Sequence, residues 1–165
     1  MWTRKSNGED VAKGALAGLI GGLVGALTME LFQAGLKKVS GQQAGGGEPA
    51  TVKVAQSVSE AARDKPLAGD EKNPAGEMVH YAFGGTAGAV YGMAAEVLPK
   101  ASAGWGILFG AALWLVADEV GVPAAGLGKY PNETPAAEQA SALAAHLVYG
   151  LTADAVRRGV LVVLG

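Results

Sequence analysis

Two histidines and a group of carboxylates are the side chains of this chain best suited to proton or ion chemistry. They lie within or beside long apolar stretches, where ionisable residues are rare and usually face a partner or water. An imidazole next to two or three carboxylates can share protons or bind a divalent cation. The sequence therefore offers a candidate ion or proton pathway formed by Glu30, His80, Asp118, Glu119 and His146 on one level, and by Glu96 and Asp154 on another.

The carboxylates share a spacing that places them on helices. Three small or apolar residues recur at four-residue intervals, and a carboxylate follows four residues after the third. This spacing keeps each set on one side of a helix. The pattern occurs as Gly18, Gly22, Ala26, Glu30; Gly84, Gly88, Gly92, Glu96; Gly106, Gly110, Trp114, Asp118; and, with a histidine in the second slot, Ala142, His146, Gly150, Asp154. It predicts four helices that pack through Gly18, Gly22, Gly84, Gly88, Gly92, Gly106, Gly110 and Gly150.

Composition indicates that these helices cross a membrane. Half of the residues are hydrophobic and 17% are charged, whereas soluble proteins average about 25% charged. Because the apolar residues form runs, we expect an all-α polytopic membrane protein, a four-helix transmembrane bundle that forms one domain over residues 1–165. The expected spans are residues 14–36, 79–98, 101–122 and 140–156, with a long loop at 37–78.

The long loop is expected to hold one short amphipathic helix. Over residues 49–65 the apolar positions follow helical spacing, while charged residues occupy the other faces. Such a helix would lie on the membrane surface or over the mouth of the bundle. Asn73 and Pro74 then predict a turn before the second span.

The second and fourth spans share a local match that suggests a tandem repeat. Val90, Tyr91, Gly92, Ala95 and Glu96 correspond to Val148, Tyr149, Gly150, Ala153 and Asp154. Two copies of a helical hairpin would be related by an axis along the membrane normal. Chance similarity between helices rich in glycine and alanine is the alternative.

Charges near the span ends bear on orientation and processing. Arg157 and Arg158 follow the fourth span, where their long side chains can reach the interface. The distribution of Lys and Arg gives a slight preference for cytoplasmic termini. Arg4, Lys5 and Lys13 before the first apolar run also resemble a signal peptide, which would be removed. The first span repeats the spacing of the other three, which favours a retained helix.

Several function classes are disfavoured by what the sequence lacks. Without cysteine there is no thiol chemistry, and a net charge of -2 provides no basic surface for nucleic acid. Nucleophile elbows, Walker loops, dinucleotide fingerprints and zinc-protease motifs are also missing. We therefore expect no enzyme, no cofactor and no nucleic-acid partner, and the sequence leaves a bound metal open.

Four stretches resemble the YagU-like family of bacterial inner-membrane proteins. They are residues 73–84 (NPAGEMVHYAFG), 95–99 (AEVLP), 111–119 (AALWLVADE) and 145–150 (AHLVYG), the last followed by Arg157 and Arg158. The resemblance extends over about residues 14–158. It implies a small multi-pass protein in a bacterial cytoplasmic membrane, and it implies no reaction, ligand or partner.

Two interpretations of function follow from the sequence. In the first, the protein is a non-enzymatic bundle in the lipid bilayer that forms a homo-oligomer or serves another membrane protein through its glycine faces. In the second, it is a proton or cation channel or transporter that uses the intramembrane carboxylates and histidines. Replacing Glu30 with glutamine would abolish flux in the second case and would change little in the first.

Overall fold

The computed structural model describes residues 7–40 and 47–165, and Arg4 and Lys5 lie outside these ranges. The described residues form helices and connecting turns, with no β-strand among them, which confirms the all-α class. The α-helices are α1 (Gly8–Ser40), α2 (Ala50–Arg63), α3 (Gly69–Val97), α4 (Ile107–Leu113), α5 (Val122–Ala124) and α6 (Ala136–Leu164). The short 3₁₀-helices η1 (Pro99–Ser102) and η3 (Pro131–Glu133) and the π-helix η2 (Trp114–Gly121) connect them.

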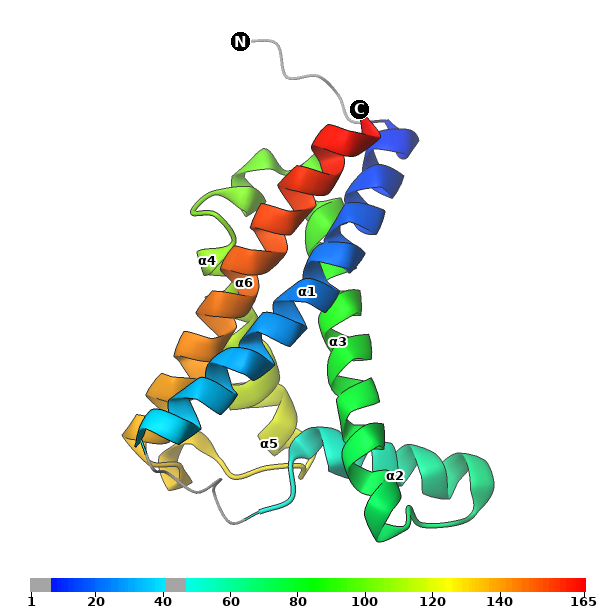
Figure 1. The fold of residues 1–165 in the computed structure, drawn as a ribbon, viewed down its shortest axis with the longest axis vertical. Helices are drawn as coiled ribbons and strands as arrows, with labels where there is room; N and C mark the ends of the chain where they lie inside the picture. The colour runs from blue at the N-terminus through cyan, green and yellow to red at the C-terminus, as the bar shows by residue number, and fades with distance from the viewer. Residues whose placement is uncertain (1–6, 41–46) are drawn as a thin grey trace.

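Helix α1 is the central element of the bundle. It packs against α3 on one side and α6 on the other, and α4 packs against α6 (Figure 1). Its N-terminus is capped reciprocally, because the Asp10 amide donates to Asn7 Oδ1 at 2.9 Å and the Asn7 amide donates to Asp10 Oδ2 at 3.1 Å. Lys37 and Lys38 in its last turn complement the helix dipole.

The long segments run between the same two ends of the molecule. At one end, here called the termini end, α1 begins and α6 finishes, and Lys13 Nζ donates to Gly165 O at 3.3 Å (Figure 1). At the other, here called the α2 end, α2 packs against α3. Lys53 Nζ of α2 donates to Leu127 O at 2.8 Å, so the connection between α5 and α6 also lies at the α2 end.

All eight glycines predicted to pack helices do so within this chain. A methyl group at Gly18 would overlap the Gly88 carbonyl oxygen, and one at Gly22 would overlap the Gly84 oxygen. Between α4 and α6, a methyl group at Gly110 would overlap the carbonyl oxygen of His146. The remaining members, Gly92, Gly106 and Gly150, make equally close contacts across the same two helix pairs. Helices α1 and α3, and likewise α4 and α6, therefore approach to backbone contact.

A second glycine face on α1, which the four-residue pattern does not include, contacts α6. A methyl group at Gly21 would overlap the Ala153 carbonyl oxygen, and one at Gly25 would lie 2.9 Å from Tyr149 Cδ2. Tyr149 is 2% exposed and donates its hydroxyl hydrogen to Gly84 O of α3 at 2.6 Å. Because α1 has glycines on two faces, α3 and α6 can both pack closely against it, and α1 lies between them.

Corresponding glycines make the closest contacts within each of the two helix pairs, α1 with α3 and α4 with α6. Gly92 of α3 contacts Gly14, as Gly150 of α6 contacts Gly106. In this comparison Gly92 corresponds to Gly150, which matches the predicted correspondence of the second and fourth spans. Gly106 corresponds to Gly14, whereas the four-residue pattern aligns it with Gly18. The third span is therefore shifted by one helical turn relative to the first. The tandem repeat itself stays a prediction.

The third predicted span differs most from its expected form. It begins at Ile107 rather than residue 101, because Gly104, Trp105 and Gly106 all have positive φ angles of 76°, 55° and 77°. Glycine at 106 permits both this left-handed backbone and the contact with Gly150. The segment then changes at Trp114 into a π-helix of eight residues, a form that is rare and frequently found at functional sites.

The predicted turn at Asn73 and Pro74 is wrong, and so is the expectation that residues 37–78 are mostly loop. Helix α1 continues to Ser40, and α3 begins at Gly69 and includes Pro74. Proline removes one backbone donor, whose acceptor would be Asp70 O near the start of the helix. Asp70 is exposed, so water can satisfy that carbonyl. The predicted amphipathic helix is present as α2, whose buried residues Val52 and Ala55 belong to the face packed on α3.

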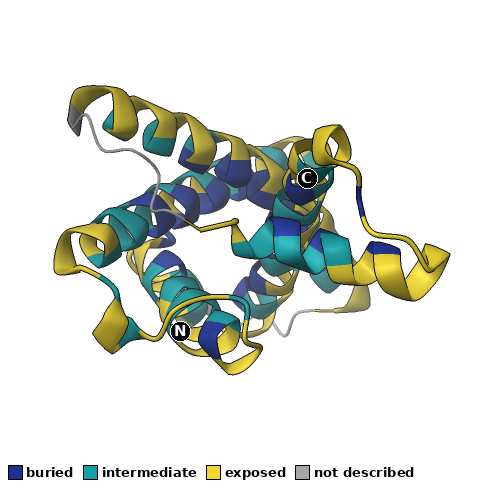
Figure 2. Ribbon diagram, turned by 90° about the horizontal axis from the view of Figure 1, so that it is seen from below, coloured by how far each residue is buried: buried dark blue, intermediate teal, exposed yellow. Residues whose placement is uncertain are grey.

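The outer surface of the bundle is apolar. Figure 2 shows buried residues mainly where helices meet and exposed residues on the outside. Leu31 is 63% exposed, Val116 66% and Val163 85%. Among the described residues, two helical segments are long and apolar enough to cross a membrane, namely Gly8–Val39 and Ile107–Ala124. This property gives weak support for a membrane protein.

Candidate functional site

The candidate residues form two polar clusters at opposite ends of the bundle. The first, the arginine cluster, consists of Glu96 on α3 and of Asp154, Arg157 and Arg158 on α6. The second, the histidine cluster, consists of His80 on α3, Asp118 on η2 and His146 on α6. The arginine cluster lies toward the termini end, and the histidine cluster lies toward the α2 end.

Every charge of the arginine cluster has an opposite charge beside it. Asp154 is fully buried, and its Oδ1 accepts from Arg157 Nε at 3.1 Å and from Arg157 Nη2 at 3.0 Å. Its Oδ2 accepts from Arg158 Nε at 2.7 Å. Arg157 Nη1 reaches across to Glu96 Oε1 on α3 at 3.0 Å. The cluster thus joins α3 to α6, which otherwise touch little.

An aromatic ring lies beside the guanidinium group of each arginine. The Arg157 guanidinium lies 5.7 Å from the centre of the Tyr91 ring, which stacks on Phe109 with ring centres 4.2 Å apart. The Arg158 guanidinium lies 4.8 Å from the Trp105 ring, and its Nη2 donates to Ser102 O at 3.0 Å. These contacts suit cation–π attraction. The expectation that Arg157 extends to the interface is wrong, because this side chain is buried and bonded to two acids.

The histidine cluster centres on the contact between His146 and Asp118. His146 is 6% exposed, and its Nδ1 lies 2.9 Å from Ala142 O and 3.7 Å from Asp118 Oδ2. A carbonyl oxygen can only accept, so the contact with Ala142 is a hydrogen bond in the tautomer that carries its proton on Nδ1. His80 approaches Ala26 O through Nε2 at 3.4 Å. At 3.7 Å Asp118 and His146 are not hydrogen-bonded, and a closer approach of the two side chains would allow proton exchange between them.

The other residues of the predicted pathway occupy less central positions. Glu30 is exposed and accepts a hydrogen bond from Tyr81 Oη at 2.7 Å. Glu119 follows Asp118 on the π-helix and is half-buried. No group of three or more His, Cys, Asp or Glu side chains is arranged to hold a metal ion among the residues described. The structure thus brings Asp118 and His146 together, and Glu30 lies beside Tyr81.

Sequence reasoning missed three parts of these clusters. It did not include Tyr91, although the match around Val90 and Gly92 contained it. It placed Glu96 close to Arg157 and Arg158 at one surface, but it did not assign the Arg157–Glu96 pair, which depends on α3 and α6 lying side by side. It also missed the π-helix that carries Asp118, for which the residue pattern contains no signal.

A family model matches residues 52–155 of the 165-residue chain, and the family is described as a protein of unknown function (DUF1440). The chain belongs to the DUF1440 family. The DUF1440 match includes Glu96, Asp118, His146 and Asp154, and it ends before Arg157. No curated protein and no solved structure matches the chain. An uncharacterised family agrees with the resemblance noted above, and the narrower YagU-like assignment stays a prediction.

Proposed function

We propose that this DUF1440 protein is a non-enzymatic integral membrane protein of a bacterial cytoplasmic membrane. Its four long segments, α1, α3, the continuous α4–η2–α5 and α6, cross the bilayer. The observation that carries the proposal is the distribution of side chains: charged groups pair inside the bundle, and large apolar groups cover the outside. A protein surrounded by water rarely exposes so much apolar surface.

The less apolar helices also fit this proposal. Helices α3 and α6 carry glycine and alanine where they pack, so their mean hydropathy is modest. Their intramembrane charges are neutralised by each other, which lowers the cost of placing them near lipid. Helix α1 contacts both α3 and α6, which supports its retention in the mature protein rather than its removal as a signal peptide.

The proposed activity is association with another membrane protein or with a second copy of this chain. The glycine faces are occupied inside the chain, so they do not supply this contact surface. We place it on the outward apolar faces, such as that of α1 with Leu16, Leu27 and Leu31. Large apolar side chains pack against lipid or protein with similar ease, and shape decides between them.

A proton or cation pathway is the second candidate, and the Asp118–His146 pair favours it. The two side chains lie 3.7 Å apart, and Asp118 is carried by a π-helix. Against it stands the arginine cluster, where the buried carboxylate of Asp154 is already bonded to two guanidinium groups. The predicted pathway includes Glu96 and Asp154, and both carboxylates are already paired in this network.

Proton flux into liposomes that contain the purified protein and an internal pH-sensitive dye separates the two candidates. We expect flux equal to that of protein-free liposomes, because the arginine cluster offers no free carboxylate. The second candidate instead requires flux that Asp118→Asn abolishes. The matched control is Asp70→Asn, which removes an exposed carboxylate from the first turn of α3. Flux lost in Asp118→Asn and kept in Asp70→Asn would overturn the non-conducting proposal.

A further inference from the structure

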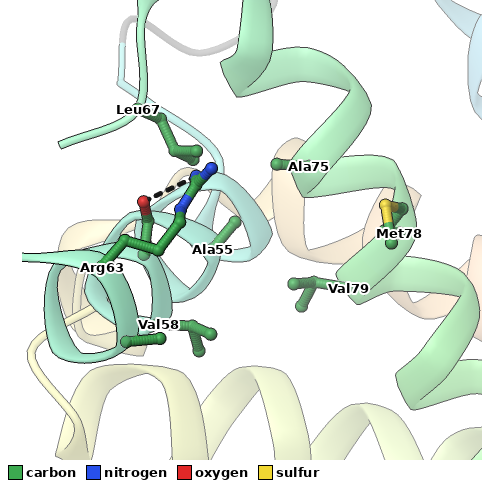
Figure 3. A pocket seen from close by; sticks show the side chains of 9 residues that line it. Ala55, Val58, Arg63, Leu67, Ala75, Met78 and Val79 are labelled. Atoms are coloured by element: carbon green, nitrogen blue, oxygen red, sulfur yellow. Dashed lines mark hydrogen bonds between the residues drawn. The ribbon is translucent and has the colours of Figure 1, made fainter. Parts of the chain in front are cut away.

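A groove of about 260 Å³ lies between α2 and α3 at the α2 end of the molecule (Figure 3). Its lining is mostly aliphatic and includes Val58 and Ala62 of α2 and Met78 and Val79 of α3. Val58 is 59% exposed and Met78 is 74% exposed, so both present apolar surface to the surroundings. The volume is slightly below the range of about 300 to 1,000 Å³ typical of small-molecule sites. It suits part of one hydrocarbon chain.

One positive charge is held at the edge of this groove. Arg63 is the charged member of the lining, and its side chain reaches toward Leu67 (Figure 3). Its Nη2 donates to Ser59 Oγ at 2.8 Å, and Ser59 in turn donates to Lys65 O at 2.8 Å. Ser59 is 5% exposed, so this bond fixes the guanidinium. No carboxylate forms an ion pair with Arg63 in the described part of the chain.

The groove also lies at the level where the bilayer surface is expected. Met78 and Val79 stand where α3 changes from its charged first turns to its apolar length. Helix α2 is amphipathic and packs its apolar face on α3. An unpaired guanidinium beside an apolar groove at this level matches a lipid phosphate followed by an acyl chain. Guanidinium groups bind phosphate with two parallel hydrogen bonds.

We propose that this groove binds one anionic phospholipid. Its phosphate accepts hydrogen bonds from the Arg63 guanidinium, and the first part of one acyl chain lies along Val58, Met78 and Val79. The binding adds a specific ligand to a protein that is otherwise solvated by lipid. The lipid-site proposal rests on the proposed location of the protein in a bilayer. A negative binding result would not contradict that location, because topology is measured separately.

Native mass spectrometry of the delipidated full-length protein tests the site. Phosphatidylglycerol and phosphatidylcholine are titrated separately. Both contain the phosphate, but the choline cation offsets its charge, so we expect one phosphatidylglycerol to bind at least about tenfold more tightly. Arg63→Gln should remove this preference, because glutamine has no positive charge to distinguish the anionic headgroup from the zwitterionic one. The matched control is Lys37→Gln, which removes an exposed cation at the same end and should keep the preference.

A second variant tests the groove apart from the charge. Ala62 is exposed, so Ala62→Phe should fold normally and weaken binding of both lipids by filling the groove. Equal affinity for the two lipids in the parent protein would overturn the proposal. So would an undiminished preference in Arg63→Gln. Displacement of phosphatidylglycerol by inorganic phosphate at similar concentration would also overturn it, because the groove would then contribute nothing.

Discussion

Replacing Arg157 with methionine should lower the free energy of unfolding by about 3 to 5 kcal/mol, the largest effect expected of any single change in this protein. The reason is that Asp154 is fully buried, and Arg157 supplies two of its hydrogen bonds and one to Glu96. Without the guanidinium, two carboxylates would share one interior region with only Arg158 as a partner. Unfolding in mixed micelles with increasing dodecyl sulfate, followed by circular dichroism, measures the change.

A matched control and a double variant separate pairing from general damage. Lys100→Met removes an exposed cation from η1, at the same end of the bundle, and should change stability by less than about 0.5 kcal/mol. Adding Glu96→Gln to Arg157→Met should recover part of the loss, because Glu96 is the carboxylate that loses its cation while Asp154 keeps Arg158. If Arg157→Met and Lys100→Met unfold alike, the arginine cluster does not stabilise the bundle.

Replacing Gly18 with alanine should destabilise the protein by about 1 to 3 kcal/mol, although alanine is the better helix former. The added methyl group would overlap the backbone oxygen of Gly88, which no side-chain rotation can move. Helices α1 and α3 would have to separate, and they would lose the contacts through Gly22 and Gly92 as well. The same unfolding titration measures this loss.

The chain provides a control with identical chemistry. Gly159 lies in α6 with nothing within 4 Å of the position that a methyl group would take. Gly159→Ala should therefore leave stability unchanged or raise it by up to about 1 kcal/mol. Equal effects of the two alanine substitutions would show that α1 and α3 are not in backbone contact.

The glycine contacts could be predicted because their spacing is itself the physical cause. Residues four apart lie on one helix face, and only glycine allows backbones to meet, so Gly18, Gly88 and Gly110 identified their interfaces. The partners of each face could not be predicted. That Gly21 and Gly25 would contact α6 depends on α1 being central, which the order of segments does not specify.

The predictions that failed concern positions where the surrounding structure, rather than the local residue preference, decides the backbone conformation. Asn73 and Pro74 are turn formers in isolation, yet Pro74 lies near a helix start, where the lost hydrogen bond can be replaced by water. The change to a π-helix at Trp114 concerns backbone hydrogen bonding, to which side-chain periodicity is insensitive.

The candidate site could be predicted only in part from the sequence, because its side-chain pairs depend on how the helices pack. The sequence grouped Asp118 with His146 because alternating crossings put them on one level, and the structure places them 3.7 Å apart. It placed Glu96 and Asp154 at one surface close to the arginines, but the particular pairs with Arg157 could not be assigned, because they depend on side-chain direction. That pairing is what favours a packing role over an open pathway at the termini end.

Cysteine accessibility tests the central claim, four crossings of the bilayer, most directly, and the chain contains no cysteine of its own. Single cysteines replace Gly8 at the start of α1, Ser57 in α2, Lys100 in η1 and Lys129 in the segment before α6. In spheroplasts a membrane-impermeant maleimide should label Ser57→Cys and Lys129→Cys, and it should label Gly8→Cys and Lys100→Cys only after permeabilisation. The reverse pattern would invert the orientation and keep the four crossings. If Lys100→Cys and Ser57→Cys are labelled from the same side, α3 does not cross, and the four-span account is wrong.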